Sequence, residues 1–198
     1  MKDDRVIGIC DRDYSEEQAD RIFYCDKCCL ELMVISENEV WHKFCDLYYN
    51  GEEDYTSVLS GILRQLAPVS MLRKENAQKN AGIEEIDFRK LKLGKYLDVH
   101  SIDICQAFTD CGWKGYYEHC LRLAANLTDE ELYEYTNGHD LCKILGMICE
   151  GGKGPLGEKK VRDILYKKYE RRNFVKTDLY NDLKQYQHQE SRTWKYVD

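Results

Sequence analysis

The sequence of 198 residues lacks any long run of hydrophobic residues. No stretch approaches the roughly 18 consecutive apolar residues that a membrane-spanning helix needs. The first five residues are too highly charged for a signal peptide. Internal repeats and low-complexity tracts are also missing. We therefore expect a cytoplasmic protein with no membrane partner.

The composition is that of a folded chain: hydrophobic residues make up 43% and charged residues 33%. This length allows one sizeable core, or one core with a smaller appended lobe. Ten cysteines are present, but without a secretory signal we expect reduced thiols that pack as small apolar side chains.

The net charge of −7 is unevenly distributed. Residues 1–60 contain 15 acidic and 6 basic side chains, whereas residues 159–176 contain 8 basic and 2 acidic ones. An acidic front and a basic helix near the end suit a metal site flanked by a phosphate-binding surface. The pattern alone does not establish such a site.

Two short apolar runs near the start predict buried strands, Val6–Cys10 and Ile22–Tyr24. After the second run, Leu30, Met33 and Val34 recur at helical spacing, which predicts a helix with Asp26 as its N-cap.

The remainder is predicted to be mainly helical, apart from a strand or hairpin within residues 86–99 and a Gly/Pro-rich loop at 151–157. The expected fold class is α/β, with a partial parallel sheet in residues 1–100 and a mainly helical lobe in residues 101–198, packed as one unit. The expected helices cover 55–79 with a break near Pro68, 139–149, 158–172 and 178–189.

The acidic triplet Asp11-Arg12-Asp13 directly follows the first predicted strand. Carboxylates two residues apart at the end of a strand can both approach one cation, and Mg²⁺ binds one or two protein carboxylates together with water and substrate phosphate. The crevice beyond the carboxyl ends of strands is also where open α/β sheets bind ligands. A loop of solvated acids is the alternative interpretation.

Other families use related patterns. An EF-hand loop starting at Asp11 would need Gly where Glu16 stands and Glu where Ile22 stands, so it is excluded. A haloacid-dehalogenase-type phosphatase remains an alternative, although Tyr14-Ser15 departs from its usual pattern. A zinc site at Cys25-x-x-Cys28 lacks a second, suitably spaced ligand pair.

The motifs taken together resemble a Toprim-fold family. A strand, Asp-Arg-Asp-Tyr, a second strand, then Asp26 and Glu31 five residues later, with Gly138-His139-Asp140 further on, are similar to a domain of unknown function related to OLD-type Toprim nucleases. That family occurs in bacterial ATPase–nuclease defence systems.

The resemblance implies a Mg²⁺- or Mn²⁺-dependent nuclease site. Asp11, Asp13 and Glu31 would be catalytic, and the same three together with Asp26 would bind metal. Capping of a helix by Asp26 and an exposed helical position for Glu31 are the structural alternatives, and a structural role is expected for His139 and Asp140. Nucleic acid, a partner ATPase and a second copy of the chain are the implied partners.

Toprim enzymes also carry a glutamate on an earlier strand, and no glutamate precedes Asp11. We therefore expect a nuclease fragment or subunit with little activity by itself, or alternatively a non-catalytic Toprim-like module that binds a partner protein or nucleic acid. A basic segment is the candidate nucleic-acid surface, with a solvated helix face as the alternative. It comprises Lys159, Lys160, Arg162, Lys167, Lys168 and Arg171.

Overall fold

The computed structural model describes residues 6–14, 21–78, 86–98 and 101–189. Strands β1 (Gly8–Cys10) and β2 (Ile22–Tyr24) pair in parallel, with Ile9 opposite Phe23. The two predicted strands are therefore present and paired, although each has only three residues. Their predicted burial is wrong, because none of their residues is buried. Within the described residues the sheets are two-stranded, so the larger parallel sheet of a Toprim fold is not confirmed.

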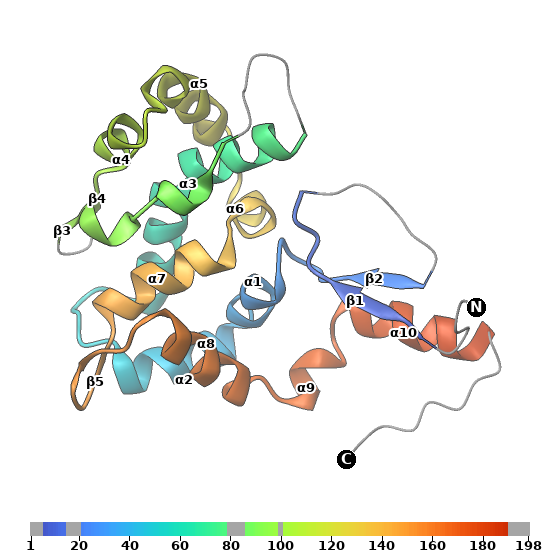
Figure 1. The fold of residues 1–198 in the computed structure, drawn as a ribbon. Coiled ribbons are helices and arrows are strands. Elements are labelled where there is room, and N and C mark those ends of the chain that lie inside the picture. The colour runs from blue at the N-terminus through green and yellow to red at the C-terminus, as the bar shows by residue number, and fades with distance from the viewer. Residues whose placement is uncertain (1–5, 15–20, 79–85, 99–100, 190–198) are drawn as a thin grey trace.

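The described part of the chain is mostly helical (Figure 1). The helices of the first half are α1 (Leu30–Ile35), α2 (Asn38–Tyr48) and α3 (Tyr55–Ala77), and those of the second half are α4 (Ile104–Asp110), α5 (Lys114–Ala125), α6 (Asp129–Tyr135), α7 (Gly138–Ile148), α8 (Glu158–Lys168), α9 (Arg171–Phe174) and α10 (Asp178–Gln189). No described helix is both long enough and apolar enough to span a bilayer.

The remaining elements are short. Two 3-10 turns, Phe88–Lys90 and Leu93–Lys95, lead into an antiparallel pair of β3 (Leu97–Asp98) with β4 (Ser101–Ile102). Of the strand or hairpin expected within residues 86–99, only Leu97–Asp98 forms a strand, and Val99 lies outside the described residues. A second antiparallel pair, β5 (Glu150–Gly151) with β6 (Gly154–Pro155), occupies the predicted Gly/Pro-rich loop.

Helix α3 passes through Pro68 without interruption, so the predicted break is wrong. Proline removes one hydrogen bond from the helix, and isolated helices usually bend or end there. Here Pro68 and its neighbours Ala67 and Val69 are buried, so tertiary packing stabilises this helix where the local propensity disfavours it. The helix starts at the N-cap Asp54, whose carboxylate accepts hydrogen bonds from Thr56 and Ser57.

One hydrophobic core draws on both halves of the chain. Its largest fully buried members include Trp41 and Phe44 of α2, Phe108 of α4 and Leu141 of α7. Most cysteines are buried, as the apolar-thiol interpretation predicts, and Cys10 and Cys105 are exposed.

A second, smaller cluster lies apart from this core and contains Cys25, Met33 and Leu179. It joins the end of β2 to α10, and Figure 1 shows these two elements side by side. The Phe23 ring packs edge-on to Tyr186, with 5.5 Å between the ring centroids. Among the described residues no further strand pairs with β1, and Val6 and Ile9 are 62% and 54% exposed. Within the described residues, both edges of this pair therefore lack a neighbouring strand.

Candidate metal centre

Asp11 is fixed where β1 ends by contacts with the segment that leads into α1. Its Oδ1 accepts the backbone N–H of Leu30 at 2.9 Å and lies 3.7 Å from the Sγ of Cys25. The next two N–H groups, of Arg12 and Asp13, both donate to the carbonyl of Cys28 at 3.0 and 3.1 Å. The acidic triplet and the Cys25–Cys28 loop therefore meet at one edge of the sheet, as the parallel pairing predicts.

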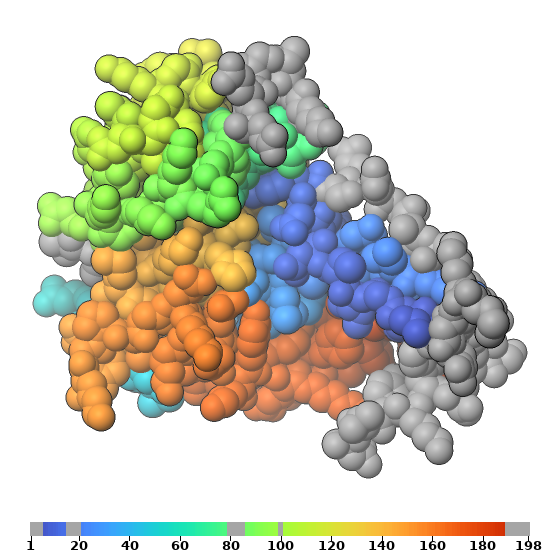
Figure 2. Space-filling view, in the orientation of Figure 1, coloured from blue at the N-terminus to red at the C-terminus, as the bar shows by residue number. Residues whose placement is uncertain are grey.

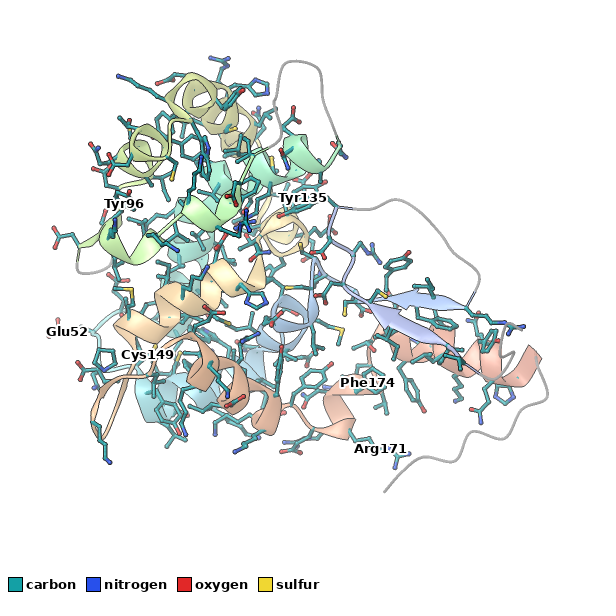
Figure 3. The ribbon with its side chains drawn as sticks, viewed as in Figure 1. Glu52, Tyr96, Tyr135, Cys149, Arg171 and Phe174 are labelled. Carbon is teal, nitrogen blue, oxygen red and sulfur yellow. The ribbon has the colours of Figure 1, made fainter. Side chains whose placement is uncertain are left out.

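Asp13 and Tyr14 adopt left-handed backbone conformations, with φ of 41° and 67°. Asp tolerates this region, but a bulky residue such as Tyr is uncommon there, and such strain concentrates at functional sites. The Tyr14 hydroxyl donates to the carbonyl of Tyr135 at 3.0 Å. Tyr135 is the last residue of α6 and is labelled in Figure 3. This contact across 121 positions stabilises the turn that carries Asp13.

Glu31 lies in the first turn of α1 and only 5% of it is exposed, so the interpretation as an exposed helical acid is wrong. Its Oε1 accepts the Tyr166 hydroxyl at 2.8 Å, and the Arg162 guanidinium lies 3.7 Å away. Helix α7 begins directly against it, because a Cβ added to Gly138 would lie 2.6 Å from the Glu31 Cβ. Only glycine fits this close approach.

The predicted start of α1, with Asp26 as its N-cap, is wrong. Helix α1 begins at Leu30 rather than near Asp26, with Cys29 as its N-cap residue. The side chain that satisfies the first N–H of this helix is Asp11, from the end of β1. This arrangement brings Glu31 one turn closer to the acidic triplet than the sequence predicted.

The three carboxylates influence one another electrostatically. Burial raises the pKa of Asp13, and the negative charges of Asp11 and Glu31 raise it further, against the lowering effect of Arg73 and His139. Burial would also raise the pKa of Glu31, but the hydrogen bond from Tyr166 and other hydrogen bonds hold it below the ordinary value. The ionised form of Asp13 is therefore disfavoured both by burial and by the neighbouring negative charges.

Asp26 does not belong to this group. Its two carboxylate oxygens accept the N–H groups of Asp178 and Leu179 at 2.9 and 2.8 Å, the first residues of α10. The predicted capping role is correct in kind, but the helix is α10 rather than the one that follows Asp26. A carboxylate with both oxygens engaged by backbone donors is poorly suited to bind a cation, and the expectation of a metal ligand at Asp26 finds no support.

Residues of α7 surround the site, as the Gly-His-Asp motif suggested. His139 Nδ1 lies 2.8 Å from Oε1 of Glu158 on α8. Asp140 is buried and paired with Arg73 of α3, which agrees with the structural role expected for it. The sequence contained no signal for Arg73 or Tyr166, because their partners lie 67 and 135 positions away.

The donor set suits a cation of the magnesium type only in part. Within residues 6–14, 21–78, 86–98 and 101–189, no three His, Cys, Asp or Glu side chains are grouped closely enough to enclose a metal ion. Asp11 and Asp13 match the simpler arrangement, in which one or two carboxylates bind Mg²⁺ and water or phosphate completes the shell. Both contacts of Asp11 among the described residues use Oδ1.

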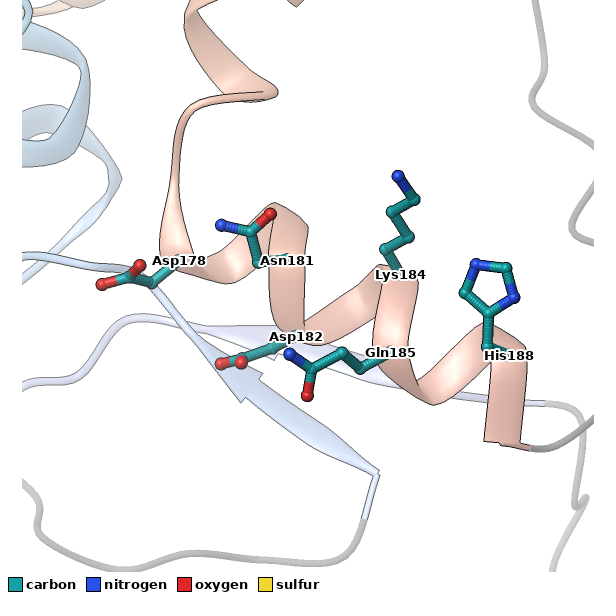
Figure 4. A pocket seen from close by; sticks show the side chains of 6 residues that line it. All are labelled: Asp178, Asn181, Asp182, Lys184, Gln185 and His188. Carbon is teal, nitrogen blue, oxygen red and sulfur yellow. The ribbon is translucent and has the colours of Figure 1, made fainter.

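The basic segment lies mainly on the surface. Lys159, Lys160, Lys167 and Arg171 are exposed, whereas Arg162 and Lys168 are half-buried. A hollow elsewhere lies along α10 (Figure 4) and is lined by Asp178, Asn181, Asp182, Lys184, Gln185 and His188. None of these side chains belongs to the site around Asp11.

Comparison of the chain with protein-family models, with curated protein sequences and with solved structures finds no match.

Proposed function

We propose that this chain is part of a Toprim-like nuclease that cleaves nucleic-acid phosphodiester bonds with the help of Mg²⁺ or Mn²⁺, and that it has little activity by itself. One observation supports the proposal most directly. Asp11 and Asp13 follow a strand of a parallel pair, and Asp13 lies within the electrostatic influence of the buried Glu31. A cation held by Asp11 and Asp13 would relieve the repulsion that raises the pKa of Asp13. Action beside a partner ATPase in phage defence is part of this proposal.

Each residue of the site has a separate role in this proposal. Asp11 and Asp13 bind the cation, which when present polarises the scissile phosphate and activates water. Glu31 adds a buried negative charge whose position is fixed by Tyr166. The Asp13–Tyr14 turn holds the Asp13 carboxylate in place through the hydroxyl contact to Tyr135.

Calorimetric titration of the chain with Mn²⁺ tests the proposal. The wild type should have a weak site, because two carboxylates without substrate phosphate leave most of the shell to water. Asp13→Asn should weaken binding, and Asp11→Asn with Asp13→Asn should abolish it. Asparagine at position 11 still offers a side-chain oxygen to the Leu30 N–H, so the fold should be preserved. Glu134→Gln, an exposed acid on α6, is the matched control.

An isotherm unchanged in the double variant would contradict the metal site. Cleavage of plasmid, single-stranded DNA and tRNA in Mn²⁺ then tests the chemistry. Cleavage that persists in the double variant would place the active site elsewhere in the molecule.

A non-catalytic Toprim-like module is the second candidate, and one observation favours it. Oδ1 of Asp11 already accepts the first N–H of α1, so this acid has a structural task without any metal. The same titration separates the candidates, because a purely structural Asp11–Asp13 turn would show no saturable Mn²⁺ site in the wild type.

A further inference from the structure

Helix α8 presents three different faces along its length. Val161, Ile164 and Leu165 are buried in the core. Glu158, Arg162 and Tyr166 follow at intervals of four and contact the residues around Glu31 and His139. The third face is exposed and carries Lys159, Lys160, Asp163 and Lys167. The helix therefore connects the carboxylate site directly to a positively charged surface, and Figure 2 shows the orange surface of α7 and α8 meeting the blue surface around β1 and α1.

Arg162 stands where these faces meet, and its hydrogen-bonding capacity is not used up. Its Nη1 is 3.7 Å from Glu31 and its Nη2 is 3.9 Å from Glu158, both longer than a hydrogen bond. Its Nε is buried and, among the described residues, has no hydrogen-bond partner. A planar guanidinium is suited to bind a phosphate with two parallel hydrogen bonds, and in Arg162 these would come from Nη1 and Nη2, because Nε is buried.

The exposed lysines differ from the basic residues of α9. Arg172 forms ion pairs with Glu39 and Glu170, which compensate its charge. No ion pair with a described residue is found for Lys159, Lys160 or Lys167, and Asp163 is the acid among them. At 1.5 Å per residue the helix is about 16 Å long, so it can contact only a few phosphates.

We propose that α8 holds the sugar–phosphate backbone of the nucleic acid, with Arg162 on the phosphate nearest the carboxylates and Lys159, Lys160 and Lys167 on the phosphates beyond it. This inference rests on the proposed nuclease function, because the continuity of the lysines with the Asp11–Asp13 site is what selects nucleic acid over other polyanions. Phosphate contacts of this kind fix the position of a strand without reading its sequence.

Fluorescence anisotropy with a short labelled oligonucleotide of mixed sequence tests the inference, at several salt concentrations and with a chelator in place of divalent metal. Replacing Lys159, Lys160 and Lys167 together by Gln should weaken binding at low salt at least tenfold. It should also reduce the slope of log affinity against log salt concentration by about 2 to 3, since each phosphate contact contributes about 0.7–0.9 to that slope. Asp163→Asn should strengthen binding, because it removes the negative charge from the same face.

A matched control replaces Lys92, Lys95 and Lys114, which are also exposed but lie away from α8. It should leave both the affinity and the salt dependence unchanged. Arg162→Lys keeps the charge and removes the planar fork, so it should weaken binding while preserving the fold.

An equal loss in both triple variants, or weaker binding by Asp163→Asn, would overturn the inference. Because metal is absent, the result is independent of the Asp11–Asp13 site. Oligonucleotide binding that depends on α8 without any Mn²⁺ binding would reject the nuclease proposal alone, and Mn²⁺ binding without the α8 effect would reject this inference alone.

Discussion

The buried Asp140 and the half-buried Arg73 form an ion pair that joins α3 to α7. Nε and Nη2 of the guanidinium both donate to Oδ2 of Asp140, at 2.9 and 2.7 Å. The guanidinium also lies over the ring of Phe88, 4.2 Å from its centroid. Its positive charge is one of the influences that lower the pKa of Asp13. The pair therefore links the packing of the helical core to the electrostatics of the candidate metal centre.

Asp140→Ala should destabilise the fold by about 3 kcal/mol, because it leaves the charge of Arg73 buried without its partner. Chemical denaturation followed by circular dichroism measures this. Arg89→Ala, which breaks the exposed ion pair with Asp87, is the control and should have a much smaller effect on stability. Similar losses in the two variants would show that the Arg73–Asp140 pair is effectively solvated.

Asp26→Ala should loosen α10, because it removes the carboxylate that accepts the N–H groups of Asp178 and Leu179. Loss of a helix cap typically costs about 1 kcal/mol. Hydrogen exchange should accelerate in α10 and β2 while α3 stays protected. Mn²⁺ affinity should not change, and a clear loss of affinity would restore Asp26 to the metal site.

Asp13→Asn should stabilise the protein at neutral pH. The folded-state pKa of Asp13 is raised above its ordinary value of 3.8, so the native state binds protons more readily than the unfolded state. Stability due to this group is therefore present at low pH and is lost as the pH rises through the raised pKa. The variant should have a higher melting temperature than the wild type at pH 7. This difference should shrink as the pH falls below 3.8, the ordinary pKa of an aspartate. An equal difference at every pH would contradict the repulsion.

Tyr166→Phe should destabilise the protein by about 2 kcal/mol at neutral pH, because the ionised Glu31 loses a hydrogen bond in a buried position. The pKa of Glu31 is lowered in the folded state, so its stabilising contribution is present above its ordinary value of 4.5 and is lost as the pH falls through the lowered one. The cost of the substitution should therefore diminish in acid. Tyr116→Phe on α5 is the control, and an equal, pH-independent cost in both variants would contradict this role.

Local patterns were sufficient for the positions of the two strands, though not for their burial, and for the end of the sheet at which Asp11 and Asp13 lie. The runs Val6–Cys10 and Ile22–Tyr24 end abruptly in polar residues, which is a signal carried by adjacent positions. The start of α7 at Gly138 could be predicted from the Asn137-Gly138 turn for the same reason.

Long-range contacts account for the errors. Asp26 has the features of an N-cap for the helix that follows it, but its carboxylate meets a helix that begins 152 positions later. From the local sequence Glu31 resembles a solvated acid, but in the fold Tyr166 and Gly138 contact it and bury it. Pro68 is a helix breaker by propensity, and only the surrounding core allows α3 to continue. In each case the deciding partner is distant in sequence.

The division of the apolar side chains into two clusters has a consequence for the order in which the molecule opens. The segment after β2 and helix α10 share the small cluster of Cys25 and Leu179 with Met33 of α1, while α3 and α7 belong to the large cluster. A unit with so few buried side chains opens at a lower free energy than the core. Because Leu30 at the start of α1 donates to Asp11 after β1, an opening that separates the β1–β2 pair from α1 would pull apart the two sides of the candidate metal centre. A cation or a bound strand that bridges them would then act as a clamp, slowing amide exchange in β1, β2 and α10 more than anywhere else in the chain.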